Sequence, residues 1–563
     1  MDSSLDLQPE ADESHEAVVS PFAHSNHQET RNPTEEVFRD GPSNYPMHTA
    51  FTNVESSQTQ SHHSLQESTN GDEEAGSRPT VHREGLELVS LAAPIVGMNL
   101  VQMLLVLSSA AFVGHLGRVE LASCQLATTL ANATGHLLLI GLTLGFETLG
   151  GRAAGAGQLA ELAHMTLCCT LLLTVLAGLI AAVWSQFAGI LLLLGQDREL
   201  SVRTARYMLL LIPSLFAHAW YAPLVTFLQS QGATRALGWA SGATLLVHVP
   251  CTWFFIYYLG WKSDGAALAT SVSYFVMLVL LAGHVYGSKQ YRAFRPTFTM
   301  KKTFRHLWPL VKLGLPSSIM LCFEYWAFDV LYILCGLLDD PYVHVSALAV
   351  AMNTLWLPSM TFVGLGAALC TRVASELGSG NTARARGATR VGLKIGAALG
   401  AVTCALVMAT HRWVPLIFVA AADGPLLRLS SRLILLVAAV ALADAIAQTA
   451  GGVIRGCGRQ SLGAVSTFCS YYLIGLPTSA ILAFPLNLGV WGLVGGQLLG
   501  VLCQAVFLGT TVAVTNWERQ AIKALDSVSE IANGAVDAVP CSSSVRVCRR
   551  AADESNAPAS SNS

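Results

Sequence analysis

Two carboxylates lie inside an otherwise apolar and aromatic stretch of the sequence, MLCFEYWAFDVLYILCG at residues 320–336. They belong to Glu324 and Asp329. A third acid, Asp444, lies in the equally apolar stretch LLVAAVALADAIAQTAGG, and Asn353 adds a neutral hydrogen-bonding group to another. A carboxylate held away from water and without a nearby cation favours its protonated form. We therefore expect these residues to take up and release protons, provided that the surrounding elements keep them out of water.

The overall composition is that of a chain that lies largely in lipid. Of its 563 residues, 52% are hydrophobic and only 12% are charged, whereas an ordinary soluble domain is about one-quarter charged. The formal net charge of −3 gives no reason to expect a nucleic-acid partner. Most of the 13 cysteines fall within apolar runs, without a CxxC or Cys/His cluster. We interpret them as small core residues and predict no metal and no cofactor.

Twelve apolar runs between residues 85 and 515 are long enough to cross a membrane as helices, which takes about 20 mostly apolar residues. A buried soluble core supplies two or three such runs but not twelve. The sequence therefore predicts an all-α integral membrane protein. The predicted spans lie near residues 88–112, 120–148, 162–187, 204–228, 236–259, 265–287, 309–336, 344–370, 386–409, 426–453, 463–485 and 489–514.

Lysine and arginine concentrate in every second loop between these spans, with a basic cluster at residues 289–305 between spans six and seven. Loops of this kind face the cytoplasm, so we expect both tails of the chain on that side. Residues 1–84 and 516–563 are polar and have little to bury. We predict that both are disordered cytoplasmic tails.

The chain carries an internal repeat. GLTLGFETLGGRAAGAGQ at the end of the second span matches GLGAALCTRVASELGSGN at the end of the eighth, which aligns Gly157 with Gly380. A second pair, SQGATR and IRGCGR, aligns Gly232 with Gly456. Two copies of six spans begin on the same side of the membrane and are related by a pseudo-two-fold axis along its normal.

We therefore expect two six-helix lobes, residues 85–288 and 307–515, joined by a basic cytoplasmic linker at 289–306. Two similar bundles that face each other leave a cavity between them. Rocking one bundle against the other exposes this cavity to alternate sides of the membrane, which is the behaviour of a transporter. A receptor or a structural membrane protein is also compatible with the duplication alone.

Helical geometry separates the two acids of span seven. Glu324 and Asp329 are five residues apart, so at 100° per residue they point roughly 140° from one another. One can face a central cavity while the other points into its own lobe. Trp356 can stack on an aromatic or cationic ligand, and Gln448 is a further candidate for substrate binding. A structural reading remains open for these polar residues, since hydrogen-bonded side chains also hold helices together.

The residues resemble a known family. PIVGMNLVQ, FVGHLGRVELAS, LATTLANATG and ETLGGRAAGAGQ resemble the first lobe of MATE (multidrug and toxin extrusion) transporters, in particular the plant-type DETOXIFICATION branch. The second lobe continues the resemblance with LPSSIMLCFEYWAFDVLYILCGLL, TRVASELGSGN and GGVIRGCGRQ. It covers roughly residues 85 to 515 and implies twelve helices in two pseudo-symmetric lobes, the MATE fold.

The resemblance implies exchange of an organic solute for a cation, usually a proton, driven by the proton motive force. Members of the family mainly export organic cations and amphipathic secondary metabolites, and some plant members export citrate. The places of Glu324 and Asp444 are associated with proton coupling. Asp329 and Asn353 occupy further coupling positions, and Gln102 and Asn132 match positions that line the cavity. We expect a monomer in the plasma membrane or the vacuolar membrane, with a small cationic or amphipathic organic solute as its partner.

Several alternatives stay open at this level. Coupling to Na⁺ remains possible because carboxylate and amide oxygens also bind hard cations. An organic-anion exporter of the same family and a non-transporting receptor or scaffold are further candidates. A lipid-linked flippase would need a cationic cavity, whereas the spans predicted to face the cavity are acidic to neutral. An enzyme is not expected, because the sequence has no metal-ligand spacing, nucleophile elbow or phosphate loop.

Overall fold

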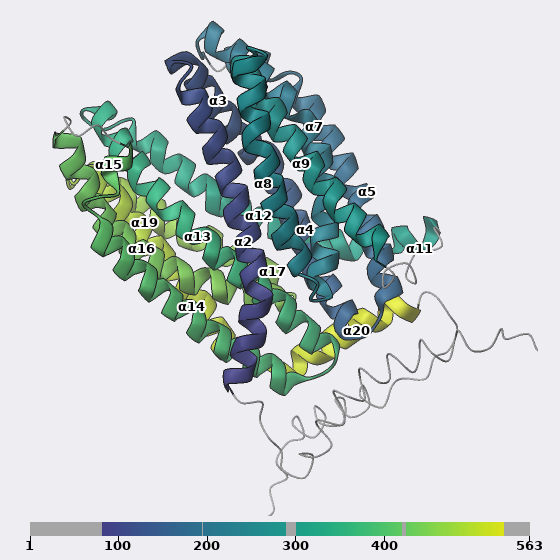
Figure 1. Cartoon of the computed structure of the whole chain (residues 1–563). Helices are drawn as coiled ribbons and strands as arrows, with labels where there is room; N and C mark the ends of the chain where they lie inside the picture. Colours follow the sequence, from purple (N-terminus) through teal and green to yellow (C-terminus); the bar gives the residue numbers. More distant parts are fainter. Residues whose placement is uncertain (1–80, 194, 289–299, 419–423, 534–563) are drawn as a thin grey trace, which may run out of the picture. The chain divides into compact units, whose positions relative to one another are not determined.

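The computed structural model describes residues 81–193, 195–288, 300–418 and 424–533 of the chain. Over these ranges the chain is built from helices and contains no strand. Twelve helical segments within the described ranges are long and apolar enough to cross a membrane. This confirms the predicted all-α membrane fold. Figure 1 shows how the helices run beside one another.

The first six spans form the first lobe. They are α2 (Val81–Gly114), α3 (Arg118–Ala131) with α4 (Leu137–Gly155), α5 (Leu159–Trp184), α7 (Arg198–Ser230), α8 (Arg235–Trp253) and α9 (Lys262–Gly287). A π-helical turn, η1 (Asn132–His136), joins α3 to α4 within one span, and η2 (Phe254–Tyr258) extends α8. The short α6 (Phe187–Leu193) precedes α7. Helix α7 is capped by Asp197, whose carboxylate accepts a hydrogen bond from the Leu200 amide at 3.0 Å.

The second six spans form the second lobe. They are α12 (Leu307–Cys335), α13 (Pro341–Gly378), α14 (Thr382–Thr410), α16 (Gly424–Gly456), α17 (Gln460–Phe468) with α18 (Leu476–Ala483), and α19 (Val490–Ala513). Another π-helical segment, η3 (Cys469–Gly475), joins α17 to α18. The short α11 (Met300–Arg305) precedes α12, and α15 (Pro415–Phe418) lies between α14 and α16.

The turns between helices test the predicted repeat. Gly157 follows α4 with a φ of 73°, and Gly380 follows α13 with a φ of 79°. Glycine adopts this left-handed conformation without steric cost, so this aligned pair is confirmed. In the second pair, Gly232 has a φ of 72°, but its counterpart is Gly458, with a φ of 74°. The alignment with Gly456 was wrong because GCG offers two glycines, and Gly456 is the last residue of α16.

The structure corrects the predicted C-terminal tail. Residues 517–533 form a helix, α20 (Trp517–Asn533), although residues 516–563 were expected to be disordered. Its apolar side chains recur at helical spacing, and Trp517, Ala521, Ala524 and Val528 are buried. This one-sided pattern stabilises a helix that packs against the bundle despite its polar composition.

Two other predicted boundaries also shift. Residues 81–84 were assigned to the N-terminal tail but belong to α2, and residues 300–305 were assigned to the linker but form α11. The rest of the predicted tails and linker, namely residues 1–80, 289–299 and 534–563, lies outside the described residues.

The two lobes pack closely at one end, which we call the basic end because Arg152, Arg235, Arg372, Arg455 and Arg459 lie there. Glycines allow this approach. A Cβ added at Gly155 of α4 would overlap the carbonyl oxygen of Ser375 in α13. One added at Gly378 of α13 would likewise overlap the backbone of α4. The backbones of the two lobes are therefore in direct contact at this end.

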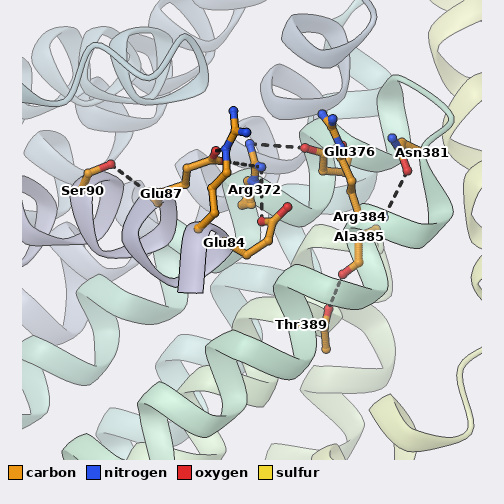
Figure 2. Close-up of polar contacts among 10 residues, drawn as sticks. Glu84, Glu87, Ser90, Arg372, Glu376, Asn381, Arg384, Ala385 and Thr389 are labelled. Atoms are coloured by element: carbon orange, nitrogen blue, oxygen red, sulfur yellow. Dashed lines mark hydrogen bonds and ion pairs between the residues drawn. The ribbon is translucent and has the colours of Figure 1, made fainter. Parts of the chain in front are cut away.

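An ion-pair cluster joins the lobes beside these glycines. Figure 2 shows Arg372 of α13 between Glu84 and Glu87 of α2 and Glu376 of its own helix. The nitrogen–oxygen distances are 3.3 Å to Glu84, 2.8 Å to Glu87 and 3.3 Å to Glu376. Glu84 is buried, so its carboxylate depends on this partner more than an exposed one would. The cluster, which we call the Arg372 cluster, closes α2 of the first lobe onto α13 of the second.

Helix α20 also lies at the basic end and contacts both lobes (Figure 1). It packs against α4 of the first lobe and against α13 and α14 of the second. Arg152 of α4 donates a hydrogen bond from Nη1 to the Ser527 hydroxyl of α20 at 3.2 Å. The closed basic end is thus covered by a helix that holds both lobes.

Candidate functional site

A cavity of about 240 Å³ lies between the lobes. Its wall comes from α2, α4 and α7 of the first lobe and from α12, α13 and α16 of the second. Five residues that the sequence singled out line it, which are Gln102, Glu324, Trp356, Asp444 and Gln448. Tertiary packing therefore brings together candidates from four separate spans.

The two acids in this wall share a hydrogen-bond donor. Gln448 lies one helical turn after Asp444 on α16, so both side chains face the same way. Its Nε2 donates to Oε1 of Glu324, and it also contacts Oδ1 of Asp444 at 3.3 Å. Because an amide nitrogen carries two hydrogens, it can donate to both carboxyl groups at once.

A second donor reaches Asp444 from α13. The Ser359 hydroxyl donates to Oδ2 of Asp444 at 2.8 Å. Pro358 precedes it within α13. Proline has no N–H to bond the carbonyl of Thr354, which loosens the helix at this point. The missing helical hydrogen bond therefore lies next to Ser359, through which α13 binds Asp444.

Glu324 and Asp444 are each only 8% exposed. Among the described residues, neither carboxyl group has a lysine, arginine or histidine nitrogen within 4.0 Å. Two buried carboxyl groups, joined by one neutral amide and open to a cavity, can exchange a proton for a cationic ligand. Such a pair of groups has the chemistry to bind either a proton or a cation.

An aromatic surface lies next to these acids. Tyr325 stacks on Trp356 with ring centroids 5.1 Å apart and an interplanar angle of 13°, and Phe328 meets Trp356 edge-on at 5.2 Å. All three line the cavity. Trp326 lies on another side of α12 and donates to the carbonyl of Ala133 at 3.4 Å. The aromatic face that lines the cavity suits a flat or cationic ligand.

The first lobe contributes a polar chain to the opposite wall. Gln102 of α2 donates to the Tyr221 hydroxyl at 3.3 Å, and this hydroxyl lies 3.2 Å from Nδ1 of His218. His218 and Tyr221 are adjacent on α7 and pack against Tyr274. Gln102, Tyr221 and His218 therefore give the first-lobe wall neutral hydrogen-bonding groups.

Three predicted site residues lie away from this cavity in the described structure. Asp329 is half-buried on a different side of α12 from Glu324, as their spacing along the helix requires. Asn353 is exposed. Asn132 lines a separate, much smaller cavity of about 40 Å³ within the first lobe, together with His136 and Tyr274.

Two charged residues of the cavity were not predicted as site residues. Glu147 of α4 and Arg455 of α16 both line it near the basic end, and both are buried. Gln229 of α7 donates to Oε1 of Glu147 at 2.8 Å and to the Thr371 hydroxyl of α13 at 2.7 Å, which links the lobes. Glu147 falls inside the predicted span 120–148, so an acid within a span was a signal that could have identified it. Arg455 was counted only as a loop cation.

A larger hollow of about 590 Å³ lies on the first lobe and contains none of the predicted residues. Most of its charged side chains pair with one another. Arg206 lies 2.7 Å from Asp264, and Arg203 pairs with Glu120. Of the charged residues that line the hollow, only Lys262 has no such pair in the described structure. The central cavity, which holds the predicted acids and their shared donor, is the better candidate site.

Comparison with known proteins gives matches over most of the chain. The family model described as MatE matches twice, at residues 94–254 and 316–481, once in each lobe. Protein DETOXIFICATION 16 from Arabidopsis thaliana is 32% identical over 473 residues, which is 82% of this chain and 95% of the relative. Protein DETOXIFICATION 3 from the same plant is 34% identical over 77% of this chain and 91% of the relative.

Solved structures agree with these matches. The crystal structure of the eukaryotic MATE transporter AtDTX14 superposes with a TM-score of 0.76 at 32% identity, covering 80% of this chain and 99% of that one. The Vibrio cholerae MATE transporter VcmN in its bent form gives a TM-score of 0.66 at 18% identity, over 81% of this chain and 100% of that one. At this low identity, the likeness to VcmN shows a shared fold and nothing further.

Proposed function

Because this chain belongs to the MatE family, whose members are transporters and not enzymes, we propose that it is a proton-coupled antiporter that exports organic cations and amphipathic solutes. The observation that carries the proposal is the bridge from Gln448 to Glu324 and Asp444 in the wall of the central cavity. An integral membrane protein of many spans has little other use for two buried acids that share one donor and face a cavity.

The charges and aromatic rings of the cavity support a cationic or amphipathic cargo. Three acids, Glu147, Glu324 and Asp444, line it against one arginine. The stacked Tyr325 and Trp356 offer a flat aromatic face beside Glu324. An aromatic cation can lie on this face and direct its charge to the acids.

Protons and cargo compete for the same two carboxyl groups in this mechanism. When both groups are ionised, the cavity attracts a cation. When protons arrive, the charge that holds the cation is neutralised and the cation leaves. A ligand shifts the balance between two conformations only through its different affinity for them. Proton binding must therefore favour the conformation that releases cargo.

Lobe contacts support an assignment of this conformation. The basic end carries the arginines that the positive-inside rule places in the cytoplasm, and it is closed by the Arg372 cluster. In the proposed cycle, this is the state in which the cytoplasmic route is shut and protons load from the other side. We further propose that the protein acts as a monomer in the plasma membrane or the vacuolar membrane.

Purified protein in vesicles tests the function directly. With an acidic lumen, a permanently charged fluorescent cation should accumulate in vesicles that contain the protein and not in protein-free vesicles. Replacing the pH gradient by a Na⁺ gradient distinguishes the two coupling ions. Uptake that ignores the pH gradient, or follows Na⁺ instead, contradicts proton coupling. Absence of uptake under either gradient contradicts export of organic cations.

A further inference from the structure

One buried cation of the cavity has no carboxylate at ion-pair distance among the described residues, although Glu147 and Glu324 attract it from farther away. Arg455 is 6% exposed and lines the central cavity. Within the described residues, no carboxylate oxygen lies within 4.0 Å of its guanidinium, and its Nε has no hydrogen-bond partner. Arg372, by contrast, pairs with three carboxylates. Arg152 of α4 is equally buried and also has no carboxylate within that distance in the described structure, but it does not line the central cavity and donates to Ser527 instead.

The backbone around Arg455 is fixed. Its carbonyl oxygen accepts hydrogen bonds from the Thr148 hydroxyl at 2.9 Å and from Gln460 Nε2 at 3.4 Å. Glycines border the guanidinium, since a Cβ added at Gly366 or Gly451 would lie 3.7 Å or 3.8 Å from its terminal nitrogens. These contacts hold the residue at the end of α16, and among the described residues no side chain is hydrogen-bonded to the Nε of its guanidinium.

A buried guanidinium without a carboxylate at ion-pair distance is only partly stabilised by more distant charges. Two acids, Glu147 and Glu324, line the same cavity, but neither approaches Arg455 within 4.0 Å. Oε2 of Glu147 is itself buried and without a partner in the described structure. A guanidinium presents a planar fork of N–H donors that matches a carboxylate with two parallel hydrogen bonds. A carboxylate is therefore the group that would bind best to Arg455.

We propose that Arg455 is a specificity-determining residue that binds the carboxylate of amphipathic substrates whose cationic part lies at Glu324 and Asp444. The inference rests on the proposed transport function and adds a second charged contact to it. Zwitterionic aromatic molecules then bind at both ends of the cavity, whereas purely cationic ones use only the acidic end. Arg455 thus distinguishes two classes of cargo that share the same aromatic frame.

A matched pair of dyes tests this assignment. A rhodamine with a free benzoic acid is zwitterionic at neutral pH, and its methyl ester has the same ring system with only the positive charge. Dye affinity is measured by fluorescence anisotropy on purified protein without any gradient, and uptake is measured in vesicles with an acidic lumen. The variants are Arg455→Gln, Arg455→Lys and, as control, Arg459→Gln, whose guanidinium contacts Thr515 outside the cavity.

In Arg455→Gln we expect the affinity and uptake of the free acid to fall about tenfold or more, as for loss of a hydrogen bond to a charged group. Those of the ester should stay within about twofold, because its only charge lies at the other end of the cavity. Arg455→Lys keeps the charge without the fork and should retain part of the free-acid binding. Arg459→Gln should leave both dyes unchanged.

Two results overturn the inference. If both dyes weaken equally in Arg455→Gln, the arginine only balances the charge of Glu147 and Glu324. If the normal protein binds the ester but not the free acid, the cavity does not recognise a carboxylate. Affinity is measured without a gradient and does not depend on transport. If proton-driven uptake fails, the transport mechanism is rejected, but the affinities of the two dyes still test the role of Arg455. Arg455→Lys serves in its place if Arg455→Gln does not fold.

Discussion

Gln448 of α16 donates a hydrogen bond to Glu324 of α12, and the same amide contacts Asp444 one turn earlier on its own helix. One neutral side chain thus connects two acids that lie on different helices and far apart in the sequence. Protonation of either acid changes the strength of the hydrogen bond that this amide donates to it. In the proposed mechanism, we therefore expect the positions of α12 and α16 to depend on the protonation of these acids.

Replacing Glu324 by glutamine should abolish uptake driven by the pH gradient, because the amide cannot take up or release a proton at physiological pH. We expect the driven rate to fall to that of protein-free vesicles, since the variant has no titratable group at this position. The measurement is the initial rate of cation uptake into vesicles with an acidic lumen.

Asp329→Asn is the matched control for that substitution, since it makes the same chemical change five residues along α12. Asp329 lies outside the wall of the central cavity, so most of the driven uptake should remain. Equal loss in both variants would show that the cavity does not distinguish the two acids.

Replacing Gln448 by leucine should destabilise the protein, because Glu324 and Asp444 lose their shared donor while staying buried. Asp444 keeps the Ser359 hydroxyl as a donor, whereas Glu324 loses the one donor that it has among the described residues. A buried group left without a partner costs about 1–3 kcal/mol. Thermal unfolding in detergent measures the effect. Gln102→Leu gives up a single bond to Tyr221 and should lower the unfolding temperature less. The reverse order would contradict the bridge.

Replacing Arg372 by alanine should loosen the basic end, since it leaves Glu84, Glu87 and Glu376 near one another without their cation (Figure 2). A shift of about 1–3 kcal/mol between conformations corresponds to a change of roughly 5–150-fold in their ratio. Cys370 is fully buried beside Thr148 at the lobe interface. Its alkylation by a water-soluble maleimide, followed by mass spectrometry of peptides, should become faster.

Arg384→Ala is the control for the Arg372 cluster, because Arg384 lies nearby on α14 (Figure 2) and has no carboxylate within 4.0 Å in the described residues. Alkylation of Cys370 should proceed at the normal rate in this variant. An unchanged rate in Arg372→Ala as well would show that the cluster does not hold the lobes together.

Replacing Gly155 by alanine should prevent full closure of the basic end, since the added methyl group overlaps the backbone of Ser375 in the other lobe. Overpacking of this kind costs about 1–3 kcal/mol. We expect faster alkylation of Cys370 and slower transport. Gly178→Ala on α5 places its methyl group in open space and should change neither. Normal transport and protection in Gly155→Ala would exclude a need for this close contact.

The sequence by itself determined the class of protein and its division into lobes. Each span is recognised by about 20 consecutive apolar residues. This is a local property of the sequence and does not depend on which other helices the span packs against. The repeat was equally readable, because Gly157 and Gly380 supply the same left-handed turn. Glu324 and Asp444 were identified as site residues because an acid within a span is rare.

Only the tertiary structure decided which polar residues share the cavity. Lipid is as apolar as the interior of the bundle, so hydropathy does not reveal how a membrane helix is rotated about its axis. The rotation of α12 turns Glu324 into the cavity and Asp329 away from it. The sequence also could not place Glu147 and Arg455 in one cavity, because their helices belong to different lobes, whose backbones touch only where glycines permit it.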